Sequence, residues 1–243
     1  MKSNLPKVKK TFYSMYIKRF LDIILSSVAI VIFSPVLLVI CILEMIFHGR
    51  PIIYNTKRPG KDAKLFSMYK FRSMTNEHGE DGYLLPEEKR LTKFGYFIRK
   101  TSLDELPGLF NILKGDMSIV GPRPLLVEYL QYYNQRHAMR HAIRPGLTLE
   151  RIIKTDSKTW TWREQFENDI WYIENVSLIV DLKMVLAIFK AVVRGSEYRA
   201  SDTRAPFDGT NLDETKDRNE LGVERHFDSL EQNNENHSNT GSR

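Results

Sequence analysis

The sequence predicts an α+β fold for a monotopic membrane protein, with a re-entrant N-terminal helix and a small, mostly helical domain on the cytoplasmic face. Three observations support this prediction. Residues 20–47 form a nearly unbroken apolar run that contains a proline, basic residues flank this run on both sides, and the chain beyond it mixes strand-like and helical patterns. A length of 243 residues suits one medium-sized domain with additional segments.

Composition narrows the class of protein further. The single cysteine, Cys41, lies in the apolar run and excludes a disulfide framework or a zinc site built from cysteines of this chain. The formal net charge is +6, but residues 197–243 hold eleven acidic and six basic residues, so the rest of the chain carries about +11. A basic body favours anionic partners such as phosphorylated substrates, lipid headgroups or nucleic acid.

The N-terminal region predicts membrane association. Residues 1–19 form a basic segment without acidic residues, and the apolar run at 20–47 follows it. This run is too long for a secretory signal and has no small-residue cleavage pattern after it. A straight helix of this length could cross a bilayer, since about 20 apolar residues suffice.

Ser34 and Pro35 interrupt the apolar run near its middle. Proline removes one backbone hydrogen bond and kinks a helix, and the Ser34 hydroxyl could satisfy the carbonyl that is left free. Each arm would then be about 20 Å long, too short to cross alone. Because basic residues lie on both sides, both ends favour the cytoplasmic face. We therefore expect a re-entrant helix over 20–47, and a kinked single-pass helix is the alternative.

Two strand-like segments open the domain expected at 48–195. Residues 51–54 predict a short strand, and residues 65–74 alternate between apolar and polar positions. Lys70 and Arg72 lie two residues apart, so on a strand they would share one face and form an anion site. A solvated basic edge is the alternative. Residues 75–90 read as a loop, and 92–100 as a helix or turn.

The stretch 99–124, RKTSLDELPGLFNILKGDMSIVGPRP, sets two adjacent carboxylates, Asp104 and Glu105, between cations. Arg99 precedes them and Arg123 follows, in a stiff Gly-Pro-Arg-Pro turn. Such a cluster suits phosphate chemistry, because arginine grips phosphoryl oxygens and a carboxylate can hold Mg²⁺. The competing interpretation is a capped helix with Ser102 as N-cap and both acids in its first turn.

The last part of the domain shows helical patterns. Residues 125–143 have apolar positions at helical spacing, and His137 and His141 lie four residues apart without an HExxH pattern, which favours a basic solvated or lipid-facing helix over a metal site. The three tryptophans fall within 159–172, where headgroup contact and core packing explain them equally well. Residues 177–193 predict a packed or interfacial helix, and the acidic tail at 196–243 is expected to be disordered.

Several motifs in order resemble the bacterial sugar transferases known as monotopic phosphoglycosyl transferases, or undecaprenyl-phosphate sugar-1-phosphate transferases. The matching blocks are Lys18-Arg19 with Asp22, Ser34-Pro35, Tyr69–Met74, Arg99–Pro107, Asn111–Pro124 and Arg144-Pro145-Gly146. They extend from about residue 18 to 195, and their co-occurrence at these spacings is highly specific. The chain is most similar to the small members that contain only the catalytic domain.

The resemblance implies transfer of a sugar 1-phosphate from a UDP-sugar to undecaprenyl phosphate at the cytoplasmic face of the bacterial inner membrane. This reaction would initiate exopolysaccharide, capsule or O-antigen synthesis, with other polysaccharide-assembly enzymes as possible partners. By the same resemblance Asp104 is the nucleophile that forms a phosphosugar intermediate, Glu105 helps to hold Mg²⁺ or to move a proton, and Ser34-Pro35 breaks the membrane helix. Substrate-binding residues would be Lys70, Arg72, Arg99, Arg123 and Arg144.

Two departures from the family pattern affect the expected activity. Gly108 stands where many members have glutamine, and the segment 149–160 reads LERIIKTDSKTW where many members have Gly-Trp-Ala-Gln-Val. The alternative hypothesis is therefore a non-catalytic membrane scaffold in a polysaccharide assembly complex. Nucleic acid is not an expected partner, because aromatic and basic residues do not interleave as in a known binding module.

Overall fold

The computed structural model describes residues 7–149, 161–193 and 205–213. In chain order the helices and strands are the π-helical turn Tyr13–Ile17, α1 (Lys18–Phe47), β1 (Ile53–Pro59), β2 (Leu65–Phe71), α2 (Glu87–Arg90), α3 (Lys93–Lys100), α4 (Gly108–Lys114), β3 (Ser118–Val120), α5 (Gln135–Ala138), β4 (Gly146–Thr148), α6 (Trp162–Asn175) and α7 (Leu178–Val193). Short 3-10 helices lie at Lys61–Ala63, Leu103–Glu105, Val127–Tyr132 and Met139–Ala142. This mixture of helix and strand agrees with the predicted α+β class.

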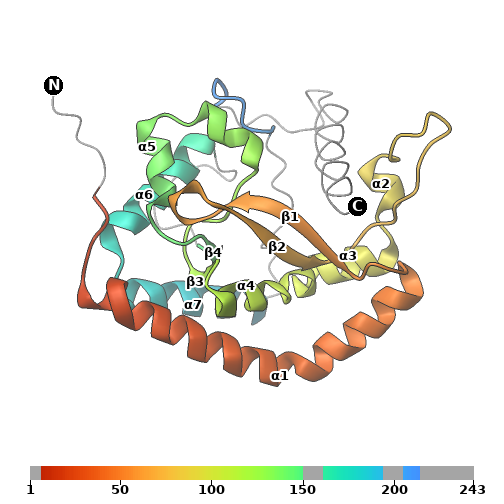
Figure 1. The fold of residues 1–243 in the computed structure, drawn as a ribbon, viewed down its shortest axis with the longest axis horizontal. Coiled ribbons are helices and arrows are strands. Elements are labelled where there is room, and N and C mark those ends of the chain that lie inside the picture. Colours follow the sequence, from red (N-terminus) through yellow and green to blue (C-terminus); the bar gives the residue numbers. More distant parts are fainter. Residues whose placement is uncertain (1–6, 150–160, 194–204, 214–243) are drawn as a thin grey trace, which may run out of the picture.

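Helix α1 is one long apolar helix that bends near its middle and runs along the lower edge of the molecule (Figure 1). Pro35 lies inside it and has no N–H to donate to the carbonyl of Val31. The Ser34 hydroxyl donates to that carbonyl instead, at 2.8 Å. By length and composition α1 could cross a membrane, and together with the preceding turn it is the one such helix among the described residues.

The polarity of α1 is inverted relative to a helix of a soluble protein. Its buried residues are Asp22, Ser26, Ile40 and Glu44, whereas most of its large apolar side chains are exposed. Residues 22 and 40 are five helical turns apart and therefore lie on the same side. This polarity suits a helix whose outer surface contacts lipid, because polar groups in a membrane face the protein interior.

Buried polar side chains join α1 to the domain above it. Asp22 accepts hydrogen bonds from the Ser118 hydroxyl and from the backbone N–H of Ile119, both at 3.0 Å. Lys18 forms an ion pair with Asp181 of α7 at 2.6 Å. Apolar contacts continue the junction, because Ile40 packs in a buried cluster with Phe71 and Ile98. Helix α1 is thus part of the domain's core.

Strands β1 and β2 form an antiparallel hairpin above α4, with a register that runs from Ile53↔Phe71 to Pro59↔Leu65. Both strands were predicted, although the first is longer and begins two residues later than expected. Strands β3 and β4 form a parallel pair with Ser118 opposite Gly146 and Val120 opposite Thr148. Nothing in the sequence analysis anticipated this second pair, because each strand has only three residues.

Two predicted segments differ from the structure. The loop expected at 75–90 contains the short helix α2. The continuous helix expected at 125–143 is broken into two 3-10 helices with α5 between them. The prediction that this segment is solvated or faces lipid is wrong, because Arg140, His137 and His141 are buried.

The C-terminal part also corrects one expectation. Residues 205–213, which we expected to be disordered, pack against the domain: Phe207 is 1% exposed and joins Tyr129, Trp162 and Phe166 in a buried aromatic cluster. The indole N–H of Trp162 donates to the carbonyl of Ala205 at 2.9 Å. Core packing therefore explains Trp162. Helix α7 keeps exposed apolar residues such as Ile179 and Leu182, as expected of an interfacial helix.

Candidate active site

The two adjacent acids lie in the 3-10 helix Leu103–Glu105, which begins directly after Ser102. Ser102 has a left-handed backbone, with φ 58°, and its side chain makes no capping hydrogen bond. The following helix α4 begins at Gly108. The capped-helix interpretation is therefore wrong: the acids occupy a separate tight turn, and a non-glycine residue at positive φ often marks a functional site.

Two of the predicted basic residues converge on this turn from different elements. Lys70 on β2 places its ammonium 3.0 Å from Glu105 Oε1 and 3.9 Å from Asp104 Oδ2. Arg123 donates from Nη2 to the same Glu105 Oε1 at 2.9 Å. Lys70 and Arg123 lie 35 and 18 residues from Glu105 in the sequence, yet both bind the same carboxylate oxygen.

The acids are buried and the cations lie nearer the surface. The side chains of Asp104 and Glu105 are 9% and 5% exposed, whereas those of Lys70 and Arg123 are 25% and 42% exposed. The cations are therefore the more accessible groups of this cluster, and an anion could contact them from solvent. Burial lowers the pKa of Lys70, and Arg123 acts in the same direction against the opposing effect of Glu105 and Asp104.

Asn111 of α4 fixes the strand that carries Lys70. Its side-chain oxygen accepts from the Tyr69 N–H at 2.9 Å, and its amide nitrogen donates to the Ser67 carbonyl at 2.7 Å. A fully buried amide thereby pairs with the free edge of β2 as another strand would. In the sequence Asn111 stands out only as part of a family motif, because local spacing gives no sign of this contact.

The turn that carries Arg123 is held between β3 and β4. Gly121 donates its N–H to the Thr148 carbonyl at 3.0 Å, and Gly146 donates to the Pro122 carbonyl at 2.9 Å. The two glycines approach so closely that a Cβ on Gly146 would lie 2.1 Å from the Gly121 nitrogen. Arg140, which the sequence analysis did not select, also donates to the backbone carbonyl of Arg123.

The other three predicted substrate-binding residues lie apart from the acid pair. Arg72 is buried and donates to backbone carbonyls of His48, Arg50, Pro51 and Met74. It therefore does not share an anion site with Lys70. Arg99 donates to the Ser73 hydroxyl at 2.7 Å and pairs with Glu87. Arg144 donates to the Gly115 carbonyl at 2.9 Å, beside Arg19.

Magnesium is the metal that the site would have to accommodate. Among residues 7–149, 161–193 and 205–213, no group of three or more His, Cys, Asp or Glu side chains is arranged to hold a metal ion. His137 and His141 are not a ligand pair, because His137 stacks on Phe166 and His141 bonds the Gly60 carbonyl. Mg²⁺ typically uses one or two carboxylates together with substrate phosphates and water. The two carboxylates of Asp104 and Glu105 would therefore be enough to hold it.

The two departures from the family pattern fall in different places. Gly108 begins α4, and a Cβ there would meet only Leu147, at 3.4 Å. A Cβ atom can therefore be accommodated at this buried position, in ordinary contact with Leu147. The divergent stretch at 149–160 lies outside the described residues, except for Leu149.

Comparison with known proteins identifies the family of this chain. Residues 13–195 match the family model for bacterial sugar transferases. The chain is 41% identical to the uncharacterized sugar transferase EpsL of Bacillus subtilis, covering 74% of this chain and 88% of that protein. It is 39% identical to a UDP-glucose:undecaprenyl-phosphate glucose-1-phosphate transferase of Klebsiella pneumoniae and 36% identical to an undecaprenyl-phosphate galactose phosphotransferase of Salmonella typhimurium.

The extent of these matches differs between relatives. The Klebsiella match covers 76% of this chain but 42% of the relative, and the Salmonella match covers 74% and 41%. This chain thus spans about two fifths of the length of those two relatives and most of the length of EpsL. The family match includes α1, both strand pairs, the acid pair and its two cations. The chain therefore belongs to the bacterial sugar transferase family.

Proposed function

We propose that this protein transfers a sugar 1-phosphate from a UDP-sugar to undecaprenyl phosphate and thereby initiates synthesis of an exopolysaccharide, capsule or O-antigen. The observation that carries the proposal is the buried Asp104–Glu105 pair, with Lys70 and Arg123 on its more exposed side. Two relatives of this chain are named as transferases that act on undecaprenyl phosphate. Both proposed substrates carry phosphate, which suits the two cations.

In the first half of the reaction, an Asp104 carboxylate oxygen attacks the phosphorus that is bonded to the sugar oxygen. A new Asp104 O–P bond forms, the P–O bond to the second phosphate breaks, and UMP leaves with the electron pair. Lys70 and Arg123 lie where they can stabilise the charge that develops on the phosphoryl oxygens and on the leaving phosphate. A carboxylate that accepts the phosphosugar divides one difficult transfer into two displacements.

In the second half, a phosphate oxygen of undecaprenyl phosphate attacks the phosphorus of the intermediate. The Asp104 O–P bond breaks and the carboxylate is restored. The product carries the sugar on a lipid diphosphate. Because the two substrates react in turn, both can use the same cations, and neither displacement requires both to be bound together.

Glu105 has a role distinct from that of Asp104 in this scheme. Its Oε1 atom binds both Lys70 and Arg123, so it holds the two cations beside the nucleophile. Asp104 and Glu105 together would hold Mg²⁺ with the diphosphate of the donor. When bound, Mg²⁺ supplies positive charge to the transferring phosphoryl group.

We also propose that α1 enters and leaves the membrane on the cytoplasmic side. The bend of α1, the Ser34 bond that replaces the one lost at Pro35, and basic residues on both flanks support this topology. The exposed apolar residues of α7 would then lie at the bilayer surface. In this arrangement the acid pair works near lipid headgroups, where the phosphate of the lipid carrier lies.

The activity is tested with the purified full chain, undecaprenyl phosphate, Mg²⁺ and a panel of radiolabelled UDP-sugars. We expect UMP release and a lipid-linked product with at least one donor, and a phosphosugar adduct on Asp104 by mass spectrometry when donor alone is present. Asp104→Asn should abolish both signals, because an amide is a poor nucleophile. Asp62→Asn, at an exposed turn of the hairpin, is the matched control and should retain activity.

Three results would reject parts of this proposal. Full activity of Asp104→Asn would remove the nucleophile assignment. No product from any donor would reject the transferase. Polymer production that persists in cells carrying only Asp104→Asn would favour a non-catalytic scaffold in the assembly complex.

Topology is tested by labelling single cysteines. In a Cys41→Ser background, Lys10→Cys and Lys61→Cys place thiols on either side of α1. A membrane-impermeant maleimide applied to intact spheroplasts should label neither position, and both should react after lysis. Labelling of one position in intact spheroplasts would indicate a membrane-spanning helix.

A further inference from the structure

Behind the turn that carries Arg123 lies a buried ion pair between Arg140 and Asp169 of α6. Their side chains are 2% and 3% exposed, and the closest nitrogen and oxygen are 2.8 Å apart. Arg140 also donates from Nε to Asp169 Oδ2 at 3.0 Å and from Nη1 to the Tyr133 hydroxyl at 3.2 Å. Burial lowers the pKa of Arg140, but Asp169 and Tyr133 raise it more, so the pKa lies above its ordinary value and the guanidinium is charged.

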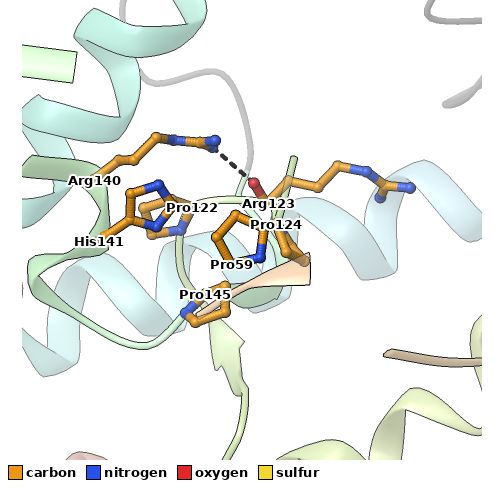
Figure 2. A pocket seen from close by; sticks show the side chains of 7 residues that line it. All are labelled: Pro59, Pro122, Arg123, Pro124, Arg140, His141 and Pro145. Atoms are coloured by element: carbon orange, nitrogen blue, oxygen red, sulfur yellow. Dashed lines mark hydrogen bonds between the residues drawn. The ribbon is translucent and has the colours of Figure 1, made fainter. Parts of the chain in front are cut away.

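One further bond connects this ion pair to the active site. Nη2 of Arg140 donates to the backbone carbonyl of Arg123 at 2.7 Å. Figure 2 shows this bond, with the Arg123 side chain extending away from Arg140 on the opposite side. The far end of that side chain bonds Glu105 Oε1. Arg140 therefore holds the backbone from which the active-site guanidinium projects.

The prolines around Arg123 make this contact effective. Pro122 and Pro124 flank Arg123 and fix φ on both sides of it, while Pro59 and Pro145 line the same small hollow (Figure 2). A segment this stiff moves as one piece. We expect that loss of the bond at the Arg123 carbonyl would shift this segment and displace the guanidinium at the end of the Arg123 side chain.

A buried ion pair is a costly way to gain stability alone. Removing two charges from water costs several kcal/mol per ion, and apolar residues of similar volume often give equal stability. A retained buried pair is better explained where its geometry performs a task. Here the guanidinium fork satisfies Asp169, Tyr133 and the Arg123 carbonyl together, which an apolar side chain cannot do.

We propose that Arg140 and Asp169 are positioning residues that set the Arg123 guanidinium against Glu105 and the phosphates of the donor. The part of this inference that concerns the donor rests on the proposed transferase function. Arg140 does not touch the reacting atoms and acts only through Arg123.

The same two helical regions supply a matched control pair. Arg136 of α5 forms a bidentate ion pair with Glu167 of α6, at 2.8 and 2.6 Å, and makes no bond to Arg123. The side chains of Arg136 and Glu167 are 42% and 39% exposed. Arg136→Lys and Arg140→Lys thus make the same chemical change between the same parts of the fold, and only the second breaks a contact with the Arg123 backbone.

The first experiment needs no enzyme activity. Arginine side chains are labelled with ¹⁵N in the full chain in nanodiscs, and the Arg123 signal is identified by its loss in Arg123→Lys. We expect Arg140→Lys to shift or broaden that signal and Arg136→Lys to leave it in place. An unchanged Arg123 signal in folded Arg140→Lys would overturn the proposal, whether or not the protein proves to be a transferase.

The second experiment measures coupling by kinetics. Losing a hydrogen bond to a charged group lowers an equilibrium or rate constant roughly 10- to 100-fold. Arg140→Lys should therefore lower kcat by that factor, with little change in the KM for the donor. In an Arg123→Ala background, Arg140→Lys should lower kcat by less than about threefold, because its effect passes through Arg123. An equal loss in both backgrounds would overturn the proposal. An inactive wild type would reject the transferase instead, and the NMR comparison would still decide the inference.

Discussion

At the level of single residues, the two acids of the site are unequal. Glu105 Oε1 receives both Lys70 and Arg123 at about hydrogen-bond distance, whereas Asp104 lies 3.9 Å from the Lys70 ammonium. Glu105 therefore accepts a hydrogen bond from each of the two cations. This contact supports the proposed role of Glu105, in which it organises the positive charge while Asp104 attacks phosphorus.

His141 provides a prediction about pH. Burial lowers its pKa from 6.5 to about 4, and Arg140 acts in the same direction. Between these values the unfolded chain binds a proton that the folded chain does not, so stability should fall as the pH drops from 6.5 to 4. The contribution is on the order of 1–3 kcal/mol. Thermal unfolding of His141→Gln across this range should show a weaker loss of stability than wild type.

The exposed His78 supplies the control for this measurement. His78→Gln should keep the pH dependence of the wild type. If His141→Gln and wild type lose stability in parallel between pH 6.5 and 4, burial does not lower the pKa of His141 in the folded protein, and this prediction is wrong.

The structure brings together charged groups that the sequence analysis had selected within one short stretch, whereas side-chain contacts with the backbone could not be predicted. The acid pair and Arg123 were selected because carboxylates and cations alternate within 99–124. The bonds of Arg72 to four carbonyls could not be predicted, since backbone carbonyls leave no mark in a sequence. For the same reason, the segment that contains Arg140 was expected to be solvated or to face lipid, whereas Arg140 is buried.

At the level of elements, the short parallel pair β3 and β4 determines where Arg123 lies. Gly146→Ala should therefore be strongly destabilising, because its Cβ would lie 2.5 Å from the Gly121 carbonyl oxygen and 2.1 Å from its nitrogen. Backbone atoms cannot move aside cheaply, so the strands must separate. We expect a lower thermal midpoint and loss of transfer, measured by unfolding in nanodiscs and by UMP release.

Gly108→Ala is the matched comparison for this glycine. Position 108 begins α4, and only Leu147 is near, at 3.4 Å. Alanine restricts the unfolded chain more than glycine, so this variant should be more stable by about 0.4–1 kcal/mol. A stability loss in Gly108→Ala that equals the loss in Gly146→Ala would contradict the proposed strand contact.

The hairpin and helices α1 and α7 could be predicted from alternation and apolar periodicity, but α6 and the region 125–143 could not. The apolar positions of 125–143 fit a continuous helix, yet tertiary contacts break it into short turns around the Arg140–Asp169 pair. The partner of Arg140 lies 29 residues away, and local spacing carries no information about it.

At the level of the whole molecule, residues 205–213 extend the core beyond the region that matches the family. Phe207 is the centre of the aromatic cluster formed with Tyr129, Trp162 and Phe166. Phe207→Ala should lower the free energy of unfolding by about 3–5 kcal/mol, because it leaves a cavity among buried rings. The change is measured as a lower thermal midpoint of the full chain in nanodiscs.

Arg163→Ala tests whether the same segment is held by charge instead. It removes an exposed ion pair with Asp213 at 2.5 Å. Such pairs contribute little, so the thermal midpoint should hardly change. A larger effect of Arg163→Ala than of Phe207→Ala would show that apolar burial does not hold this segment.

The sequence predicted the order of the apolar helix, the domain and the tail, but it did not predict that the three segments pack into shared hydrophobic clusters. An apolar run followed by a polar domain suggested an anchor and a separate catalytic unit, with a free tail. Ile40 packs with Phe71 and Ile98, and Phe207 packs with α6, so the contacts cross both expected boundaries. A run of apolar residues predicts a helix that is removed from water, but it does not predict which face of the helix packs against the rest of the protein.

The bond between Asp22 and strand β3 has a consequence for how the lipid carrier is met. The strand that begins at Ser118 leads within five residues to Arg123, so under the proposed topology the depth of α1 in the bilayer would set the height of the acid pair above it. Under the proposed function, each prenyl chain would then have to rise or tilt until its phosphate reaches that height.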